Sequence, residues 1–383
     1  MMTLRWMRAE LTEEPGRAVR RLAAFALATT FVALVAGCAG DAAGGAAGEG
    51  TQEVFSTRSQ SVLAREEPKV PVPAVAVPQL RTDPAELRTS AINLLQLACE
   101  SEAPILRANG IEALRYAPEY LDGPLRMGLT DENRGVRFNA VWMVGDLRLE
   151  SMASLVEPLL SDPSESVQAA AIYAMHRCNR PVDPSPLGRM VMSSDPEIRG
   201  NAAMAIGEIG DPSALPMLDD ALGVASMRAS AARMQLVDLQ IAAASVKLGD
   251  ERDLEVIRAA FFAPPERGAE LTLLACEIVA DLGDLGSVPT LKELASRTGE
   301  LQPPAEIRMA AVQALAQLEP STALSDVPRT YIGSERFELR ALAASTLGET
   351  RDESNLPLVG TMLGDQSPMV QVAAAKGILM LTD

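Results

Sequence analysis

The chain has 383 residues, of which 48% are hydrophobic and 22% are charged, so it can bury a large core and is not a disordered protein. Its formal net charge of -17 argues against nucleic acid as a partner, because an acidic surface repels phosphate. Aromatic residues make up only 3%, and Ala and Leu are abundant. This composition favours helices over strands, and we expect an all-α fold.

Residues 1–37 have the pattern of an export signal. Arg17, Arg20 and Arg21 precede an uncharged apolar stretch at residues 22–37. That stretch has 16 residues, which is short for a helix that spans a membrane. The sequence therefore predicts a signal that directs the protein to the cell envelope.

The apolar stretch ends in Val35-Ala36-Gly37-Cys38, which resembles the lipobox of bacterial lipoproteins. In that motif the signal is cut before the cysteine, so the resemblance implies that Cys38 is the lipidated first residue of the mature chain. Ala39 in place of Asp implies the periplasmic side of the outer membrane if the cell is Gram-negative. An ordinary cleaved signal and an uncleaved anchor remain the alternatives.

Residues 38–83 are rich in Gly, Ala, Ser and Pro and predict a tether without a fold of its own. The prolines near its end, in PKVPVPAVAVPQL, favour an extended polyproline conformation. A flexible coil of this length spans roughly 35 to 40 Å. We therefore expect the folded part, residues 84–383, to lie close to the membrane but away from its surface.

One pattern recurs throughout residues 84–383 at spacings of 30 to 39 residues. Each copy has an apolar anchor residue, a small residue four positions later in every copy but the one with Ile241, and an apolar residue eight positions later in every copy but the one with Ser245. These three positions share one face of a helix. The anchors are Leu106, Val136, Val167, Ile198, Val237, Leu271, Ile307, Leu339 and Val370.

The position four residues after the anchor is almost always Ala, which predicts that a neighbouring helix approaches closely there. A shorter apolar helix precedes each anchor helix, as at residues 213–222 and 287–295. The repeat unit is thus a helical hairpin that cannot bury its apolar face alone. We expect about nine hairpins to stack into an α-solenoid with a right-handed superhelix.

Helix boundaries are also readable in the sequence. Asp162-Pro163 and Asp195-Pro196 predict a capping carboxylate followed by proline at the start of a helix. Gly-Asp at 210–211, 249–250 and 283–284 predicts a turn between one helix and the next.

The segment from Asp195 to Asp211, DPEIRGNAAMAIGEIGD, resembles HEAT repeats, and most closely the HEAT-like repeat named for phycobilisome lyases. The resemblance covers about 300 residues and nine repeats. It implies a ladder of polar contacts between repeats, formed by Arg107, Arg137, Arg199, Arg308 and Arg340. The ladder is interrupted at Gln168, Asp238, Thr272 and Gln371.

Motifs for catalysis are missing from the sequence. His176 is the only histidine, and no phosphate-binding loop, Rossmann fingerprint or calcium loop occurs. The cysteines at 38, 99, 178 and 276 are far apart, so neither a zinc site nor a disulfide framework is indicated. We expect no enzyme activity, no metal and no cofactor.

The position six residues after the anchor varies most among the repeats, and three adjacent repeats fill it with Trp142, Tyr173 and Met204. Phe138 and His176 share that helix face. Exposed large rigid side chains suit a partner surface, so these five residues are the candidate binding site. The alternative is that they pack beneath the first helices or the tether.

Longer spacings between residues 224 and 305 indicate inserted loops on one edge, around residues 227–234, 264–265 and 303–304. Such edges bind partners in many solenoids, although a neutral insertion explains them equally well.

The function that these features predict is a non-catalytic cell-envelope lipoprotein that acts as a scaffold for a protein or peptide partner. The resemblance to phycobilin-lyase repeats implies an alternative, a lyase or chaperone-like factor that handles a prosthetic group. A third interpretation is a structural component that associates end to end, because the last repeat stops at residues 378–383 without a polar cap.

Overall fold

The computed structural model describes residues 83–383 except residues 228 and 321–324, and it gives only the backbone of residues 265–267. Residues 1–82, with the predicted signal, tether and Cys38, lie outside the described part. The described residues form helices and no strand. They make an α-solenoid of nine two-helix repeats, which confirms the predicted fold class.

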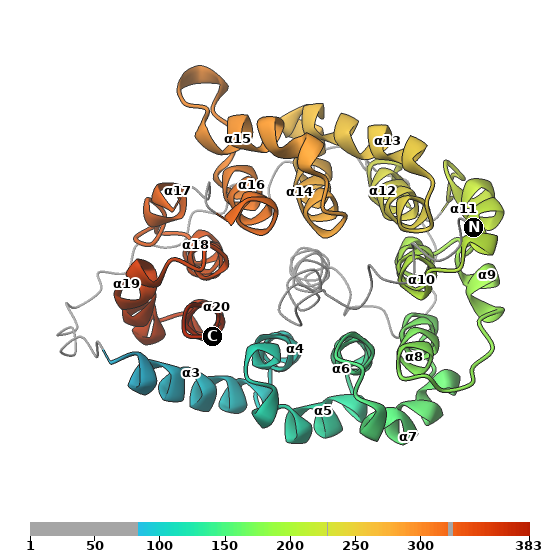
Figure 1. Ribbon diagram of the computed structural model, residues 1–383, viewed down its shortest axis with the longest axis horizontal. Coiled ribbons are helices and arrows are strands. Elements are labelled where there is room, and N and C mark those ends of the chain that lie inside the picture. Colours follow the sequence, from blue (N-terminus) through green and yellow to red (C-terminus); the bar gives the residue numbers. More distant parts are fainter. Residues whose placement is uncertain (1–82, 228, 321–324) are drawn as a thin grey trace, which may run out of the picture.

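Each repeat contributes one helix to an outer layer and the next to an inner layer (Figure 1). The outer helices are α3 (Pro84–Cys99), α5 (Asp122–Leu129), α7 (Ala153–Val156), α9 (Pro186–Met190), α11 (Leu215–Ala221), α13 (Leu254–Ala259), α15 (Val288–Ser296), α17 (Asp326–Arg329) and α19 (Leu356–Thr361). The inner helices are α4 (Pro104–Ala113), α6 (Arg134–Asp146), α8 (Glu165–Arg177), α10 (Pro196–Ile209), α12 (Ala231–Lys247), α14 (Pro265–Asp281), α16 (Ala305–Leu318), α18 (Phe337–Glu349) and α20 (Pro368–Leu381).

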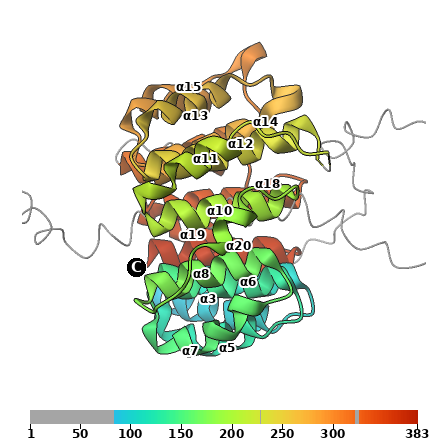
Figure 2. The same cartoon turned by 90° about the vertical axis from the view of Figure 1, so that its right-hand side faces the viewer.

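The solenoid closes into a ring. The last helix, α20, packs against α3 and α4 of the first repeat (Figure 1). The inner helices appear end-on in Figure 1 and lengthwise in Figure 2, so their axes run through the thickness of the ring. Because the first repeat covers the end of the last one, the uncapped end needs no second molecule, and the reason for expecting end-to-end association is removed.

Polar contacts join the two ends at the seam of the ring. Lys376 Nζ on α20 donates to Glu112 Oε1 on α4 at 2.7 Å, and both residues are buried. Arg88 on α3 donates to the carbonyl oxygen of Leu379 at 3.3 Å and to Thr382 Oγ1 at 3.2 Å. Burial lowers the pKa of Lys376, but nearby groups, Glu112 foremost, raise it above its usual value, so this lysine is charged.

Small residues set the distance between the two layers, as the Ala pattern predicts. The residues four positions after the anchors are all buried, and a Cβ atom added at Gly128 of α5 would lie 2.9 Å from Ala140 Cβ of α6. Neighbouring inner helices also meet through glycine, since a Cβ at Gly348 of α18 would lie 2.5 Å from Gly377 Cα of α20. Larger side chains at these positions would separate the helices.

The predicted cap at Asp195 is confirmed, because its side chain accepts from the backbone amides of Glu197 and Ile198 at the start of α10. The equivalent prediction at Asp162 is wrong. Helix α8 begins two residues later than expected, with Ser164 at its N-cap position. Asp162 instead accepts from the Ser164 amide and forms an ion pair with Arg137 of the preceding repeat.

The Gly-Asp turns are confirmed. Gly210 has a φ of 78°, and Asp211 accepts from the amide of Ser213 at the start of the next repeat. Asp250 and Asp284 make the same contact two residues onward. Arg351 has a φ of 54° in the corresponding turn, where the chain takes this left-handed conformation without glycine.

Candidate functional site

The position six residues after the anchor forms a column on the inner side of the ring. The Ala position two residues earlier faces the outer layer, and two residues correspond to a rotation of about 200° around a helix. The variable position therefore points to the opposite side, toward the ring centre. We call this set the inner column; it consists of Glu112, Trp142, Tyr173, Met204, Ala243, Glu277, Gln313, Ser345 and Lys376.

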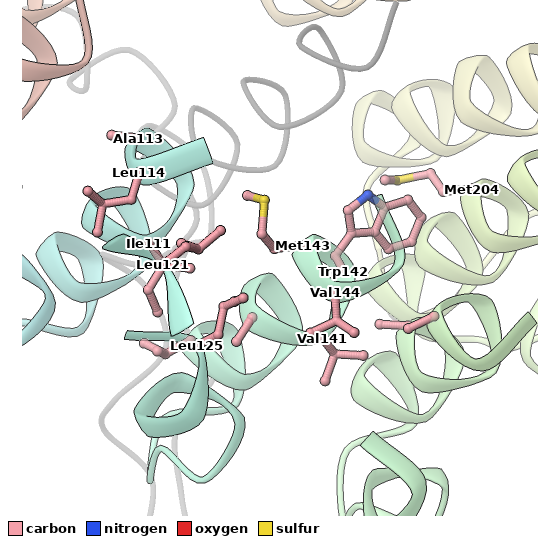
Figure 3. Packing of buried hydrophobic residues seen from close by; sticks show 14 of the residues in the cluster. Ile111, Ala113, Leu114, Leu121, Leu125, Val141, Trp142, Met143, Val144 and Met204 are labelled. Atoms are coloured by element: carbon pink, nitrogen blue, oxygen red, sulfur yellow. The ribbon is translucent and has the colours of Figure 1, made fainter. Parts of the chain in front are cut away.

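The aromatic members of the predicted site form one stack. The Phe138 and Trp142 rings lie 5.7 Å apart between centroids, and the Trp142 and Tyr173 rings lie 4.2 Å apart, both nearly parallel. Met204 on α10 reaches toward the Trp142 indole (Figure 3). We call these four residues, contributed by α6, α8 and α10, the aromatic arc. A Cβ at Gly145 would lie 2.6 Å from Tyr173 Cε1, so the stack needs glycine there.

The structure buries most of this predicted site. The exposed fractions are 7% for Trp142, 0% for Tyr173 and 3% for Met204. Phe138 is half-buried, and His176 is exposed and takes no part in the stack. The structure thus brings together four of the five predicted residues, and their role in binding a partner stays a prediction.

A buried polar network fixes the aromatic arc. Tyr173 Oη donates to Asp146 Oδ1 at 2.7 Å, and Arg115 Nη2 on the preceding repeat donates to Asp146 Oδ2 at 3.2 Å. Burial raises the pKa of Asp146, while the Arg115 charge and the Tyr173 hydroxyl oppose the rise. The tyrosine is therefore held in place by the two repeats before it in the chain.

A second network joins the next repeats. Lys247 on α12 lies between Glu208 on α10 and Asp281 on α14 and forms an ion pair with each. Burial lowers the pKa of Lys247, but the two carboxylates raise it above its usual value. The sequence interpretation missed both networks. Their signal is a charged residue ten positions after the anchor, as at Asp146 and Glu208, where a solvent-exposed helix end would have explained the charge equally well.

Between α14 and α18 the inner column carries polar side chains instead of aromatic ones. A cleft between α14 and α16, closed on one side by α18, is lined by apolar side chains with Glu277 and Gln313 among them. Gln313 Nε2 and Ser345 Oγ are buried without a hydrogen-bond partner. We call Glu277, Gln313 and Ser345 the polar arc. The sequence interpretation placed these residues in the column but did not single them out.

The arginine ladder is structural, as the repeat resemblance implies. Arg107, Arg137 and Arg340 form ion pairs with the next repeat, with distances of 2.7 to 2.8 Å to the carboxylate oxygens of Asp131, Asp162 and Asp365. At two interruptions of the ladder a glutamine still makes a hydrogen bond. The Nε2 atoms of Gln168 and Gln371 each donate to a backbone carbonyl within their own repeat at 2.6 Å. Arg199 donates to backbone carbonyls instead, and Arg308 donates to the carbonyl oxygen of Ala295 and to Tyr331 Oη.

The inserted loops carry exposed apolar side chains. Met227, Phe262 and Leu301 are 105%, 77% and 74% exposed. All three lie in connections from an outer to an inner helix, so they share one rim of the ring. This rim is distinct from the inner face and matches the edge that the repeat spacing predicts.

Within the described ranges no group of three metal-binding side chains occurs, and no helix there is long and apolar enough to cross a membrane. Cys99, Cys178 and Cys276 are buried free thiols. Burial raises the pKa of Cys99 to about 12, so this thiol is protonated at neutral pH.

Comparison with known proteins finds HEAT repeats at residues 91–176 and 152–237. No curated protein matches the chain. Among solved structures, it is similar to the complex of CpcE and CpcF of phycocyanin lyase from Nostoc sp. PCC7120, with 14% identity, 66% of this chain and 92% of that chain covered, and a TM-score of 0.30. It is also similar to Kap121p bound to Nup53p, with 11% identity, 76% and 41% coverage, and a TM-score of 0.31. At these values neither neighbour informs the function.

Proposed function

We propose that this chain, which carries HEAT repeats at residues 91–176 and 152–237, binds a partner protein on the inner face of its ring and catalyses no reaction. The proposal rests on the inner column. Two other repeat positions keep their chemistry in most repeats: the buried position four residues after the anchor and the position of the arginine ladder. The inner column changes from charged to aromatic to polar around the ring, which suits recognition of one specific partner.

Unsatisfied groups on the inner face support the same proposal. A buried polar atom without a partner destabilises a fold by about 1 to 3 kcal/mol. Gln313 Nε2 and Ser345 Oγ are in this state. A partner that supplies hydrogen bonds to them recovers this energy on binding.

We further propose that the ring is attached to the cell envelope by a lipid on Cys38, as the lipobox resemblance implies. The Cys38→Ala variant should then move from the membrane fraction to the soluble fraction, and mass spectrometry of the wild-type amino terminus should detect the lipid. A variant that stays in the membrane fraction would contradict a lipid anchor at this residue.

Partner capture tests the binding proposal. The native protein is crosslinked in its own membranes and purified, alongside Phe138→Ala/His176→Ala, which changes the accessible members of the predicted site. The matched control is Leu155→Ala/Val256→Ala on the outer helices α7 and α13, where both side chains are exposed. A protein captured by the wild type and the control but lost with the inner-face variant supports the proposal. Equal capture by both variants places the site elsewhere.

The absorbance spectrum of the purified native protein tests the alternative of a factor that handles a prosthetic group. A bound chromophore would favour that alternative over the scaffold.

A further inference from the structure

The cleft between α14 and α16 combines apolar walls with the carboxyl groups of Glu277 and Glu306 and the amides of Gln313 and Gln317. Leu273 and Ala280 of α14, Ala310 of α16 and Leu342 of α18 form the walls. Glu277 and Gln313 line the cleft from the same inner column. Such a site accepts a side chain that has an apolar stem and a polar end.

Glu277 has no directly bonded cation in the described part of the chain. It makes no hydrogen bond or ion pair with any described residue, whereas the nearby cations are engaged: Lys376 binds Glu112, and Lys247 binds Asp281. Burial, followed by the charges of Glu112 and Asp281, raises the pKa of Glu277 well above its usual value, and only Lys376 opposes this. A cation that enters the cleft would therefore favour the ionised form of this carboxyl, which has no bonded partner among the described residues.

Gln313 provides an independent observation. Its side chain is 9% exposed, lines the cleft, and leaves Nε2 without a hydrogen-bond acceptor. An amide donor in this position fits a carbonyl oxygen, the acceptor that every peptide unit carries. Glu306, the other carboxylate in the cleft, is already paired with Arg336 at 3.0 Å, and Gln317 is the other amide that lines the cleft. Glu277 and Gln313 are the two polar lining residues that belong to the inner column.

We propose that this cleft binds a lysine side chain of the partner protein, with the ammonium group on Glu277 and a partner backbone carbonyl on Gln313 Nε2. The inference rests on the proposed function and names the chemistry of the segment that binds. The methylene stem of lysine lies along the apolar walls, and its compact ammonium group neutralises the one unpaired carboxylate. The charge-assisted hydrogen bond and the neutralised charge together favour lysine over a neutral side chain of the same length.

Short peptides test the proposal directly. Fluorescein-labelled acetyl-Ala-Leu-Lys-Leu-Ala amide is titrated with the full-length protein in detergent, and its anisotropy is compared with that of peptides with N-acetyl-lysine or norleucine at the central position. The wild type should bind the lysine peptide about tenfold more tightly than the other two, since a hydrogen bond to a charged group contributes at least this factor. Glu277→Gln should remove the preference, and Gln313→Leu should weaken all three peptides alike.

Glu251→Gln is the matched control, because Glu251 is exposed and lies on the outer side of the neighbouring repeat. It should keep the lysine preference. A preference that survives Glu277→Gln overturns the proposal, as does equal binding of the three peptides or no binding at millimolar protein. If n-butylammonium displaces the lysine peptide as well as unlabelled peptide does, the cleft binds small amines and the assignment to a protein segment is wrong.

The same variants separate this inference from the proposed function. A partner captured equally by wild type and Glu277→Gln, but lost with Phe138→Ala/His176→Ala, leaves the scaffold in place and overturns only the lysine site. Circular dichroism of Glu277→Gln confirms that the ring is folded, since glutamine has nearly the same shape as glutamate.

Discussion

The aromatic arc and the polar arc occupy the same repeat position but differ in how their polar groups are satisfied. Tyr173 donates to Asp146, which also accepts from Arg115. These hydrogen bonds connect the aromatic arc to the two preceding repeats. In the polar arc, Gln313 and Ser345 have unpartnered buried atoms, and Glu277 has no bonding partner among the described residues. The repeat thus fixes the helices that carry the inner column. The residues of the column pack together in the aromatic arc, and we propose that those of the polar arc bind a partner.

The seam holds both arcs in one ring, and we expect the largest effect there. Lys376→Met leaves the buried carboxylate of Glu112 without its ion-pair partner, which should lower the free energy of unfolding by about 3 to 5 kcal/mol. Urea denaturation followed by circular dichroism measures the loss. The double variant Glu112→Gln/Lys376→Met should recover most of it, and a single variant as stable as wild type would mean that this ion pair does not secure ring closure.

The second largest loss of stability is expected from a substitution in the aromatic arc. Tyr173→Phe removes the hydroxyl that donates to Asp146 and leaves a buried acceptor short of one hydrogen bond, so we expect a loss of about 1 to 3 kcal/mol. Thermal unfolding gives the comparison. Tyr120→Phe, at an exposed tyrosine, is the control and should have little effect. Equal stability of both variants would show that the network does not fix the arc.

A substitution in the polar arc should raise the stability of the fold instead of lowering it. The pKa of Glu277 is raised in the folded state, so ionising this carboxyl opposes folding, and the stability that its protonated form provides is lost as the pH rises through the folded pKa. Glu277→Gln should therefore be more stable than wild type at pH 8, by about 0.5 to 1 kcal/mol.

This difference should vanish below the unfolded pKa, near the ordinary value of 4.5, where the wild-type carboxyl is protonated in both states. Thermal unfolding at several pH values checks it, with Glu251→Gln as the control. A variant that is less stable than wild type at pH 8 would mean that Glu277 has a stabilising partner.

The rim loops should give the smallest effect. Met227→Ser/Phe262→Ser changes two exposed side chains and should alter the free energy of unfolding by no more than about 0.5 kcal/mol. If partner capture is lost in this stable variant, the rim and not the inner face is the binding surface.

Much of the local structure could be predicted from the sequence. The spacing of anchors such as Val136 and Val167 defined the helices, because residues four and eight positions later share a helix face. The Gly210-Asp211 turn was predicted for the same kind of reason, since glycine adopts a positive φ and aspartate caps the next turn. These features depend on a few neighbouring residues, which is why the fold class and the nine repeats were confirmed.

The tertiary structure decided what depends on the sum of all repeats. The small rotation between neighbouring hairpins determines whether nine of them form an open superhelix or a ring. This rotation accumulates around the solenoid, so the sequence of a single repeat does not predict the outcome. Ring closure places Lys376 beside Glu112, 264 positions earlier in the chain. It also decides which polar groups find partners: Asp162 pairs with Arg137 of the preceding repeat, and Glu277 with none of the described residues. A helical pattern shows which residues share a face, but only the packing of one repeat on another determines what that face meets.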